Sequence, residues 1–254
     1  MDMNELLHVA TFAGKIILES GGETYRVEET IWRICKIYGI EEAESFVTPT
    51  GIMVSIIDQG RTYSLIRRIS KRTIDLNKVD KVNYLSRNII SKNLSVSDLK
   101  KELEIISNGE RYSKKIEILF SAFSAFCFVL LIHGELKEAI SAFFIGSIIK
   151  LASNKFSELG INEFFINSIC ASIAASFSIV LQQLNLISNM DKTIIGSIML
   201  LVPGLAITNA IRDTISGDLL AGLIRAAEAF LIAISIAIGT GLVLSFWFNF
   251  LGGH

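Results

Sequence analysis

The sequence has little cysteine, histidine and proline, and its C-terminal half has little charge. Three cysteines, Cys35, Cys127 and Cys170, are isolated, with no C-x-x-C pair, and the three histidines do not cluster with them. This argues against a disulfide framework and gives no sign of a metal site. We expect the thiols to act as small apolar side chains, and we expect no metal, no cofactor and no nucleic acid partner.

Charge is concentrated in the first half of the chain. Residues 1–115 hold 18 of the 24 Lys and Arg and 16 of the 25 Asp and Glu. Crossing a hydrocarbon core of roughly 30 Å takes about 20 apolar helical residues. The second half offers five runs near that length, of which the second is short and could be re-entrant: 116–133, 138–153, 164–187, 193–210 and 219–248. We therefore predict an N-terminal cytoplasmic α+β domain, residues 1–112, followed by an α-helical transmembrane bundle of about five spans, residues 113–254.

Positive charge beside the predicted spans indicates their orientation. On the side of the N-terminal half lie Arg111, Lys114, Lys115, Lys150, Lys155 and Arg212, against Lys137 and Lys192 on the other. A signal peptide is not expected, because the first long apolar run begins near residue 116. We expect a multi-pass protein of the inner (plasma) membrane with its N-terminal domain in the cytoplasm.

The N-terminal half shows helical spacing of apolar residues that gives way to β-branched runs and then returns. The predicted elements are helices at 4–19 and 23–38, strands near 44–48, 52–57 and 62–69, and helices near 77–92 and 95–108. Ser95 and Asp98 form a capping pattern at the start of the last helix.

The densest polar stretch of this half is GGETYRVEET, residues 21–30. Glu23, Arg26, Glu28 and Glu29 could build an active site, but charges in the first turns of a surface helix are mostly solvated. We favour the solvated interpretation. No G-x-S-x-G, Walker-type loop or paired metal-ligand pattern supports catalysis, so we expect no enzyme and assign no catalytic residue.

A helix breaker, Pro203-Gly204, interrupts the fourth apolar run. Pro203 removes one N–H, so the carbonyl of Met199 loses its usual partner. Such a defect persists in a membrane only where protein, water or a ligand supplies the missing hydrogen bond. A simple packing kink accounts for the break equally well. The polar residues that follow favour a functional site: Thr208, Asn209, Arg212, Asp213 and Asp218.

The last apolar run contains two further charges, Arg225 and Glu228, on one broad helical face with Asp218 and Gly222. A charge held at bilayer depth costs about 2.5–3.5 kcal/mol and usually faces a partner or a water-filled cavity. Alternatively, the first turns of this long run stand in the interface and Arg225 snorkels. Because a broken helix and charges of both signs occur together, we favour a translocation site.

Four stretches, SGGETYRVEETI, SFVTPTGIMVSI, DLNKVDKVNYLSR and VPGLAITNAIRDTISGD, resemble in this order those of the threonine/serine exporter family. The resemblance covers nearly the entire chain. It implies export of small hydrophilic metabolites, which are threonine and serine in some members and dicarboxylates such as succinate in similar split systems. The implied substrate-binding and translocation residues are Pro203, Gly204, Asn209, Arg212, Asp213, Asp218, Arg225 and Glu228.

Roles within this group follow from chemistry. Arg212 or Arg225 could hold a substrate carboxylate through a bidentate contact. Asp213, Asp218 or Glu228 could meet an ammonium group or carry a coupling proton.

The chain departs from long family members, which fuse a second membrane part after this one. It looks like one half of a split exporter, so the resemblance implies a second small membrane subunit and an oligomer, together with a small-molecule substrate and the lipid bilayer. Two other functions stay open. One is a membrane-anchored enzyme acting through residues 21–30, and the other is a ligand sensor or scaffold whose spans only anchor it. An anchor has no need of Pro203 or of charges on the last helix.

Overall fold

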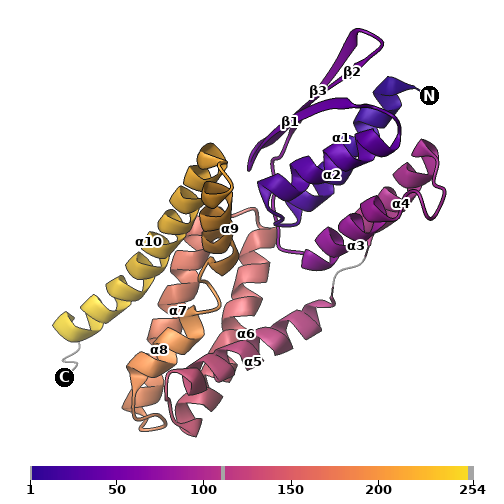
Figure 1. The fold of residues 1–254 in the computed structure, drawn as a ribbon. Coiled ribbons are helices and arrows are strands. Elements are labelled where there is room, and N and C mark those ends of the chain that lie inside the picture. The colour runs from indigo at the N-terminus through magenta and orange to yellow at the C-terminus, as the bar shows by residue number, and fades with distance from the viewer. Residues whose placement is uncertain (1, 110–111, 251–254) are drawn as a thin grey trace. The chain divides into compact units, whose positions relative to one another are not determined.

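The structure is a computed structural model that describes residues 2–109 and 112–250. Arg111, used above for the orientation, lies outside these residues. The described residues form ten helices and one three-stranded sheet (Figure 1). Contacts divide the chain into two compact units. The first comprises residues 1–110 and 205–227, and the second comprises residues 111–204 and 228–254.

The first unit begins with the order predicted from the sequence. Its elements are α1 (Met3–Glu19), α2 (Thr24–Ile37), β1 (Glu42–Thr48), β2 (Gly51–Asp58), β3 (Arg61–Arg68), α3 (Leu76–Arg87) and α4 (Val96–Asn108). The strands pair antiparallel in the order β1-β2-β3. The predicted cap of α4 is confirmed, because the Ser95 side chain accepts a hydrogen bond from the backbone N–H of Asp98.

Helix α1 forms the centre of this unit and contacts α2, β2, β3, α3 and α4. Its apolar stripe is buried, and so is the inward side of the sheet, where Ile52, Val54 and Ile56 alternate with exposed or half-buried residues along β2. This period of two is what a half-buried strand requires. Burying each such side chain is worth about 1.5–3 kcal/mol, so these contacts fix which helix faces meet the sheet.

Two later elements complete the first unit: most of α9 (Gly204–Ile215) and the first turns of α10 (Leu219–Phe250). They lie close together at Gly222, where an added Cβ would stand 2.2 Å from Thr214 Oγ1 and 3.0 Å from the Ala210 carbonyl oxygen. Only a residue without a side chain fits such an approach.

The second unit contains α5 (Lys114–Leu131), α6 (Leu136–Glu158), α7 (Glu163–Gln183), α8 (Met190–Ile198) and the remainder of α10. Helix α5 packs on α6 and α8, and α7 packs on the same two helices. Glycines allow close helix approach, as is common in membrane bundles. An added Cβ at Gly196 would stand 2.2 Å from Val129 Cγ2, and one at Gly239 would stand 2.1 Å from the Ser168 carbonyl oxygen.

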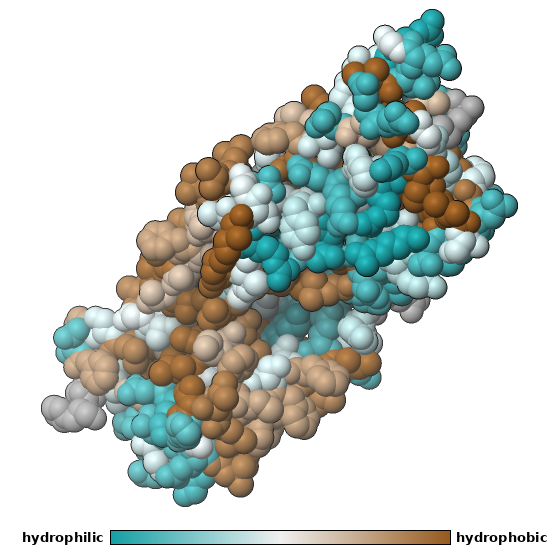
Figure 2. Space-filling view, viewed as in Figure 1, coloured by the Kyte–Doolittle hydropathy of each residue, from teal (hydrophilic) through white to brown (hydrophobic). Residues whose placement is uncertain are grey.

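The prediction of a five-span bundle is wrong. Among the described residues, two helices are long and apolar enough to cross a membrane, α7 and α10. Helix α5 opens with Lys114, Lys115 and Glu117, and α6 carries charges near both ends. The predicted span 193–210 is divided between α8 and α9, each shorter than the roughly 20 residues that a crossing needs. Figure 2 shows hydrophobic residues gathered over the helices of the second unit on the viewed face.

The chain is not helical between Ile198 and Gly204, as the Pro203-Gly204 dipeptide predicted. The carbonyl oxygen of Met199 accepts a hydrogen bond from the Val202 N–H at 3.4 Å, so a local turn replaces the bond that the proline removes. The chain passes from the second unit to the first directly after this break, between Gly204 and Leu205.

Candidate functional site

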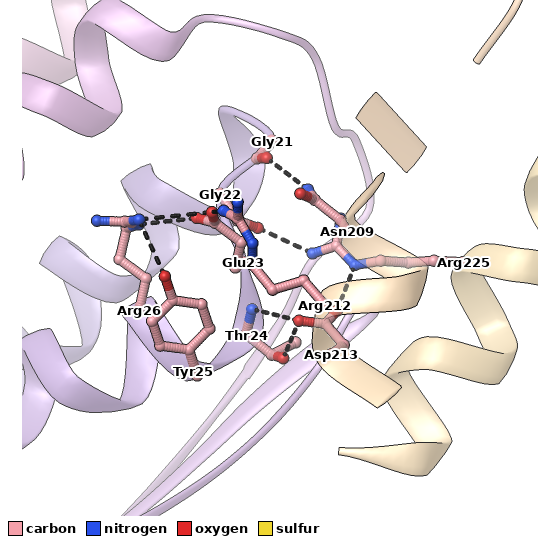
Figure 3. Close-up of polar contacts among 10 residues, drawn as sticks. All are labelled: Gly21, Gly22, Glu23, Thr24, Tyr25, Arg26, Asn209, Arg212, Asp213 and Arg225. Atoms are coloured by element: carbon pink, nitrogen blue, oxygen red, sulfur yellow. Dashed lines mark hydrogen bonds and ion pairs between the residues drawn. The ribbon is translucent and has the colours of Figure 1, made fainter. Parts of the chain in front are cut away.

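Five of the predicted site residues lie in the first unit, on α9, in the turn after it and in the first turns of α10: Asn209, Arg212, Asp213, Asp218 and Arg225. Their side chains meet the short segment that joins α1 to α2, Gly21 to Thr24 (Figure 3). Each of the four residues in this segment has a polar partner on α9 or α10. The site is built from two stretches that are far apart in the sequence.

The segment owes its shape to two glycines. Gly21 has φ +88°, a left-handed conformation that glycine adopts readily. At Gly22 an added Cβ would stand 2.4 Å from Ile17 Cγ2. The N–H of Gly22 donates to the Ile17 carbonyl at 2.9 Å and closes the end of α1. The two carbonyls of Gly21 and Gly22 remain available for side chains of α9 and α10.

Those carbonyls accept hydrogen bonds from two of the predicted residues. Asn209 Nδ2 donates to the Gly21 oxygen at 3.0 Å. Arg225 Nη2 donates to the Gly22 oxygen at 2.8 Å. Both Asn209 and Arg225 are buried, and buried polar groups need such partners.

Asp213 is fully buried and forms the centre of the cluster. Its Oδ1 accepts hydrogen bonds from the Thr24 hydroxyl at 2.8 Å and from the Thr24 N–H at 3.3 Å. Its Oδ2 lies 2.9 Å from Arg225 Nε, an ion-pair contact whose angle is not that of a hydrogen bond. A carboxylate at the first turn of α2 also satisfies an N–H that the helix leaves unpaired. Asp213 therefore joins α2, α9 and α10.

Glu23 lies at the N-cap position of α2, but its side chain does not cap the helix. Its carboxylate instead binds two guanidinium groups. Arg26 Nε donates to Oε2 at 2.7 Å, and Arg212 donates to Oε1. Burial raises the pKa of Glu23, but the hydrogen bonds from Arg26 and Arg212 outweigh it and lower the pKa to about 2. Glu23 is therefore ionised at neutral pH.

Two more carboxylates stand beside this network. Asp218 Oδ2 lies 3.2 Å from the Thr24 hydroxyl. Glu28, one helical turn after Thr24, accepts a hydrogen bond from the Val47 N–H at 3.1 Å. Burial, together with the negative charges of Asp218 and Asp213, raises the pKa of Glu28 to about 7. The Glu28 carboxyl therefore changes charge near neutral pH.

Glu28 also lines an open groove of about 650 Å³ in the first unit. Its other lining residues come from α2, β1, β2 and the turn before β1: Tyr25, Glu29, Trp32, Glu41, Glu42, Ala43, Glu44, Ser45, Ser55 and Ile57. The groove is acidic and has two aromatic side chains in its wall.

The structure changes the interpretation of GGETYRVEET. Glu23 and Thr24 are buried, so the prediction that the charges of this stretch are mostly solvated is wrong for Glu23. In the sequence, the signal for a buried role was the resemblance of this stretch to a family motif. Its local residue pattern fits any surface helix. The remaining predicted residues, Pro203, Gly204 and Glu228, belong to the second unit.

These features define a class of protein: a mostly helical protein with two described helices apolar enough to cross a membrane, in which a charge near the start of α10 is paired with α9 and with the segment before α2. A family model described as ThrE, "Putative threonine/serine exporter", matches residues 8–247. The chain belongs to this family. The family's description is that of a transporter.

Three relatives extend the comparison. A Klebsiella aerogenes protein named "Probable succinate transporter subunit YjjP" is 26% identical over 232 residues, which cover 91% of this chain and 90% of that protein. An Escherichia coli protein of the same name is 25% identical over 237 residues, covering 92% and 91%. A Mycobacterium tuberculosis protein named "Probable threonine/serine exporter" is 21% identical over 240 residues, covering 92% of this chain but 45% of that protein. No solved structure matches the chain.

Proposed function

We propose that this chain is a subunit of a secondary exporter that moves small hydrophilic metabolites across the inner membrane. The cargo is threonine and serine, or a dicarboxylate such as succinate. The observation that carries the proposal is the family match over residues 8–247, supported by relatives whose names describe succinate transport and threonine/serine export. The geometry supplies the residues through which the chain would act.

Arg212 is the residue that we assign to the solute's carboxylate. Its side chain is 49% exposed, whereas the side chain of Arg225 is 5% exposed and is committed to Asp213 and to the Gly22 carbonyl. A guanidinium that reaches solvent can bind a carboxylate in bidentate fashion. Arg225 and Asp213 then position α9 and α10, and Asn209 supports them through Gly21.

The other predicted residues keep the roles inferred from their chemistry. Pro203 and Gly204 form the helix break at the end of residues 111–204 of the second unit, directly before the first unit resumes at Leu205. Asp218 and Glu228 are candidates for an ammonium group of an amino-acid solute or for a coupling proton. Because 18 of the 24 Lys and Arg lie in residues 1–115, we place the N-terminal half in the cytoplasm.

A second membrane subunit completes the exporter in this proposal. The mycobacterial relative is more than twice as long as the region that matches this chain, and the two YjjP proteins are named as subunits. By analogy with the YjjP proteins, this chain would act as one subunit beside a second membrane subunit. Assembly into an oligomer follows from the same argument.

The test is efflux from cells that express the chain together with its membrane partner, with threonine, serine and succinate measured outside. Arg212→Ala is expected to lower efflux about tenfold or more, because a hydrogen bond to a charged group is worth about 1.5–3 kcal/mol. Arg33→Ala is the matched control, since Arg33 has its own polar partners, Glu29 on α2 and Ser86 on α3. Equal efflux from wild type and Arg212→Ala, with both proteins present in the membrane, would refute the assignment.

A further inference from the structure

The Glu23 carboxylate lies between two arginines that come from different parts of the chain. Arg26 contacts it from α2, with Nε 2.7 Å from Oε2 and Nη2 3.4 Å from Oε1. Arg212 contacts Oε1 from α9. Two guanidinium groups around one carboxylate make a strong, geometrically defined binding site for that group.

A second Glu–Arg pair on α2, whose arginine is 20% exposed, shows what a pair within one helix looks like in this protein. Glu29 binds Arg33 one turn later, and its side chain is 44% exposed. The side chain of Glu23 is 10% exposed and is bound by two arginines. The Glu29–Arg33 pair lies within one helix, whereas Glu23 is also bound by an arginine from another helix, α9.

The exposure of the three side chains shows how another carboxylate could enter. Glu23 is the most buried of the three, while Arg26 is 24% exposed and Arg212 is 49% exposed. Neither arginine side chain is fully buried, although Arg26 Nη2 also donates to the Tyr25 hydroxyl at 3.1 Å. A solute that carries a carboxylate offers each of them the same acceptor that Glu23 offers.

We propose that Glu23 occupies, in the empty protein, the position between Arg26 and Arg212 that the carboxylate of an exported solute takes, and that the solute displaces it. This inference rests on the proposed export function. It identifies the recognised group as a carboxylate, which threonine, serine and succinate share. Glu23 is a competitor in this site, and Arg26 is a second binding residue beside Arg212.

Displacement also releases a link between α2 and α9. While Glu23 binds Arg212, the carboxylate of α2 is tied to the guanidinium of α9. When a solute takes its place, Arg212 is neutralised by a group that is not attached to α2. Solute binding thereby becomes coupled to the contact between the two helices.

The experiment measures binding of succinate, L-threonine and threoninol to the purified full-length chain in detergent, by calorimetry. Threoninol has the amino and hydroxyl groups of threonine but no carboxylate. Removal of a competitor raises the competent fraction, so Glu23→Gln is expected to tighten Kd for succinate and threonine by up to about tenfold. The Kd of Glu23→Gln for threoninol is expected to equal the wild-type value. Glu29→Gln is the matched control and leaves every Kd unchanged.

A Kd in Glu23→Gln that equals or exceeds the wild-type value, in a protein with wild-type helical content, overturns the inference. Should Glu23→Gln fail to fold, Arg26→Lys in the otherwise wild-type chain replaces it. This variant is expected to weaken binding of both carboxylate solutes severalfold relative to Arg33→Lys, and equal effects of the two overturn the inference.

Efflux assays on the same variants separate this inference from the export proposal. Efflux of a carboxylate solute with wild-type dependence on concentration in Glu23→Gln refutes the competitor role and leaves the exporter standing. Absence of both efflux and binding in the wild-type chain with its partner refutes both.

Discussion

Thr24 and Asp213 are separated by 189 positions in the sequence, yet the Thr24 hydroxyl donates to Asp213 Oδ1 at 2.8 Å. Asp213 also pairs with Arg225, so a short polar segment after α1 is tied to α9 and α10 through one carboxylate. Because both side chains are buried, removing either one leaves the other charge in the protein interior without a countercharge. This dependence gives the first prediction.

Asp213→Asn is expected to destabilise the chain by about 3–5 kcal/mol, because it leaves the buried guanidinium of Arg225 without its countercharge. Thermal unfolding of the purified protein measures the loss. Asp191→Asn, at an exposed position in the first turn of α8, serves as the control. Replacing Asp213 and Arg225 together by apolar residues should recover much of the stability. An unchanged Tm in Asp213→Asn alone would contradict the role of the pair.

Thr24→Val keeps the shape of the side chain and removes its hydroxyl. The expected loss is about 1–3 kcal/mol, because Oδ1 of the buried Asp213 carboxylate loses the shorter of its two hydrogen bonds and keeps only the one from the Thr24 N–H. Thr30 on the same helix provides a matched control, since its buried hydroxyl has no hydrogen-bond partner among the described residues. Thr30→Val is expected to be neutral or stabilising. Equal losses for the two valine variants in denaturant unfolding would show that Thr24 acts only through packing.

Glu28 gives the fold a pH dependence of defined sign. Its pKa is raised from 4.5 to about 7 by burial and by Asp218 and Asp213. The folded chain therefore holds this proton more tightly than the unfolded chain does. The contribution of Glu28 to stability is complete below about pH 4.5 and is lost as the pH rises to about 7.

The variant Glu28→Gln removes this titration. Its Tm is expected to fall less than the wild-type Tm between about pH 5 and about pH 8, because the amide cannot ionise. Glu104→Gln, at an exposed position on α4, should follow the wild-type curve. Parallel curves for wild type and Glu28→Gln would mean that Glu28 is as well solvated in the folded chain as in the unfolded one.

Packing of α10 on α7 in the second unit depends on Gly239. An added Cβ there would stand 2.1 Å from the Ser168 carbonyl oxygen, and Ser172 Oγ donates to the Gly239 carbonyl at 2.9 Å. Gly239→Val is expected to cost about 1–3 kcal/mol by overpacking. Gly241→Val lies two positions further along the same helix, where no described heavy atom stands within 4 Å of an added Cβ. Thermal unfolding of both variants checks the contrast, and similar Tm values would refute the close approach.

Local patterns predicted much of the first unit. The spacing of apolar residues located α1 and α2, β-branched runs located the three strands, and Ser95 with Asp98 located the start of α4. These predictions succeeded because each depends on residues that are neighbours in sequence. The helix break at Pro203 belongs to the same kind of inference, since the missing N–H acts within one turn.

The predicted number of spans was wrong because it too depended on local sequence alone. Hydropathy along a window does not distinguish a spanning helix from shorter helices joined by a turn, and α8 and α9 together resembled one span. The role of GGETYRVEET was also misjudged. Whether a charge in the first turn of a helix meets water or another side chain depends on what packs against that helix, and Arg212 comes from α9.

The sequence by itself determined the elements of the first unit, the apolar character of α7 and α10, the set of polar residues around positions 209–225 and the family. The tertiary structure alone decided that these polar residues meet Gly21 to Thr24, that Arg225 is committed to Asp213, and that Arg212 shares Glu23 with Arg26. The physical reason is range. Secondary structure and hydropathy arise from neighbours along the chain, whereas the pairing of buried charges depends on which distant segments the packing of the core brings within a few ångströms.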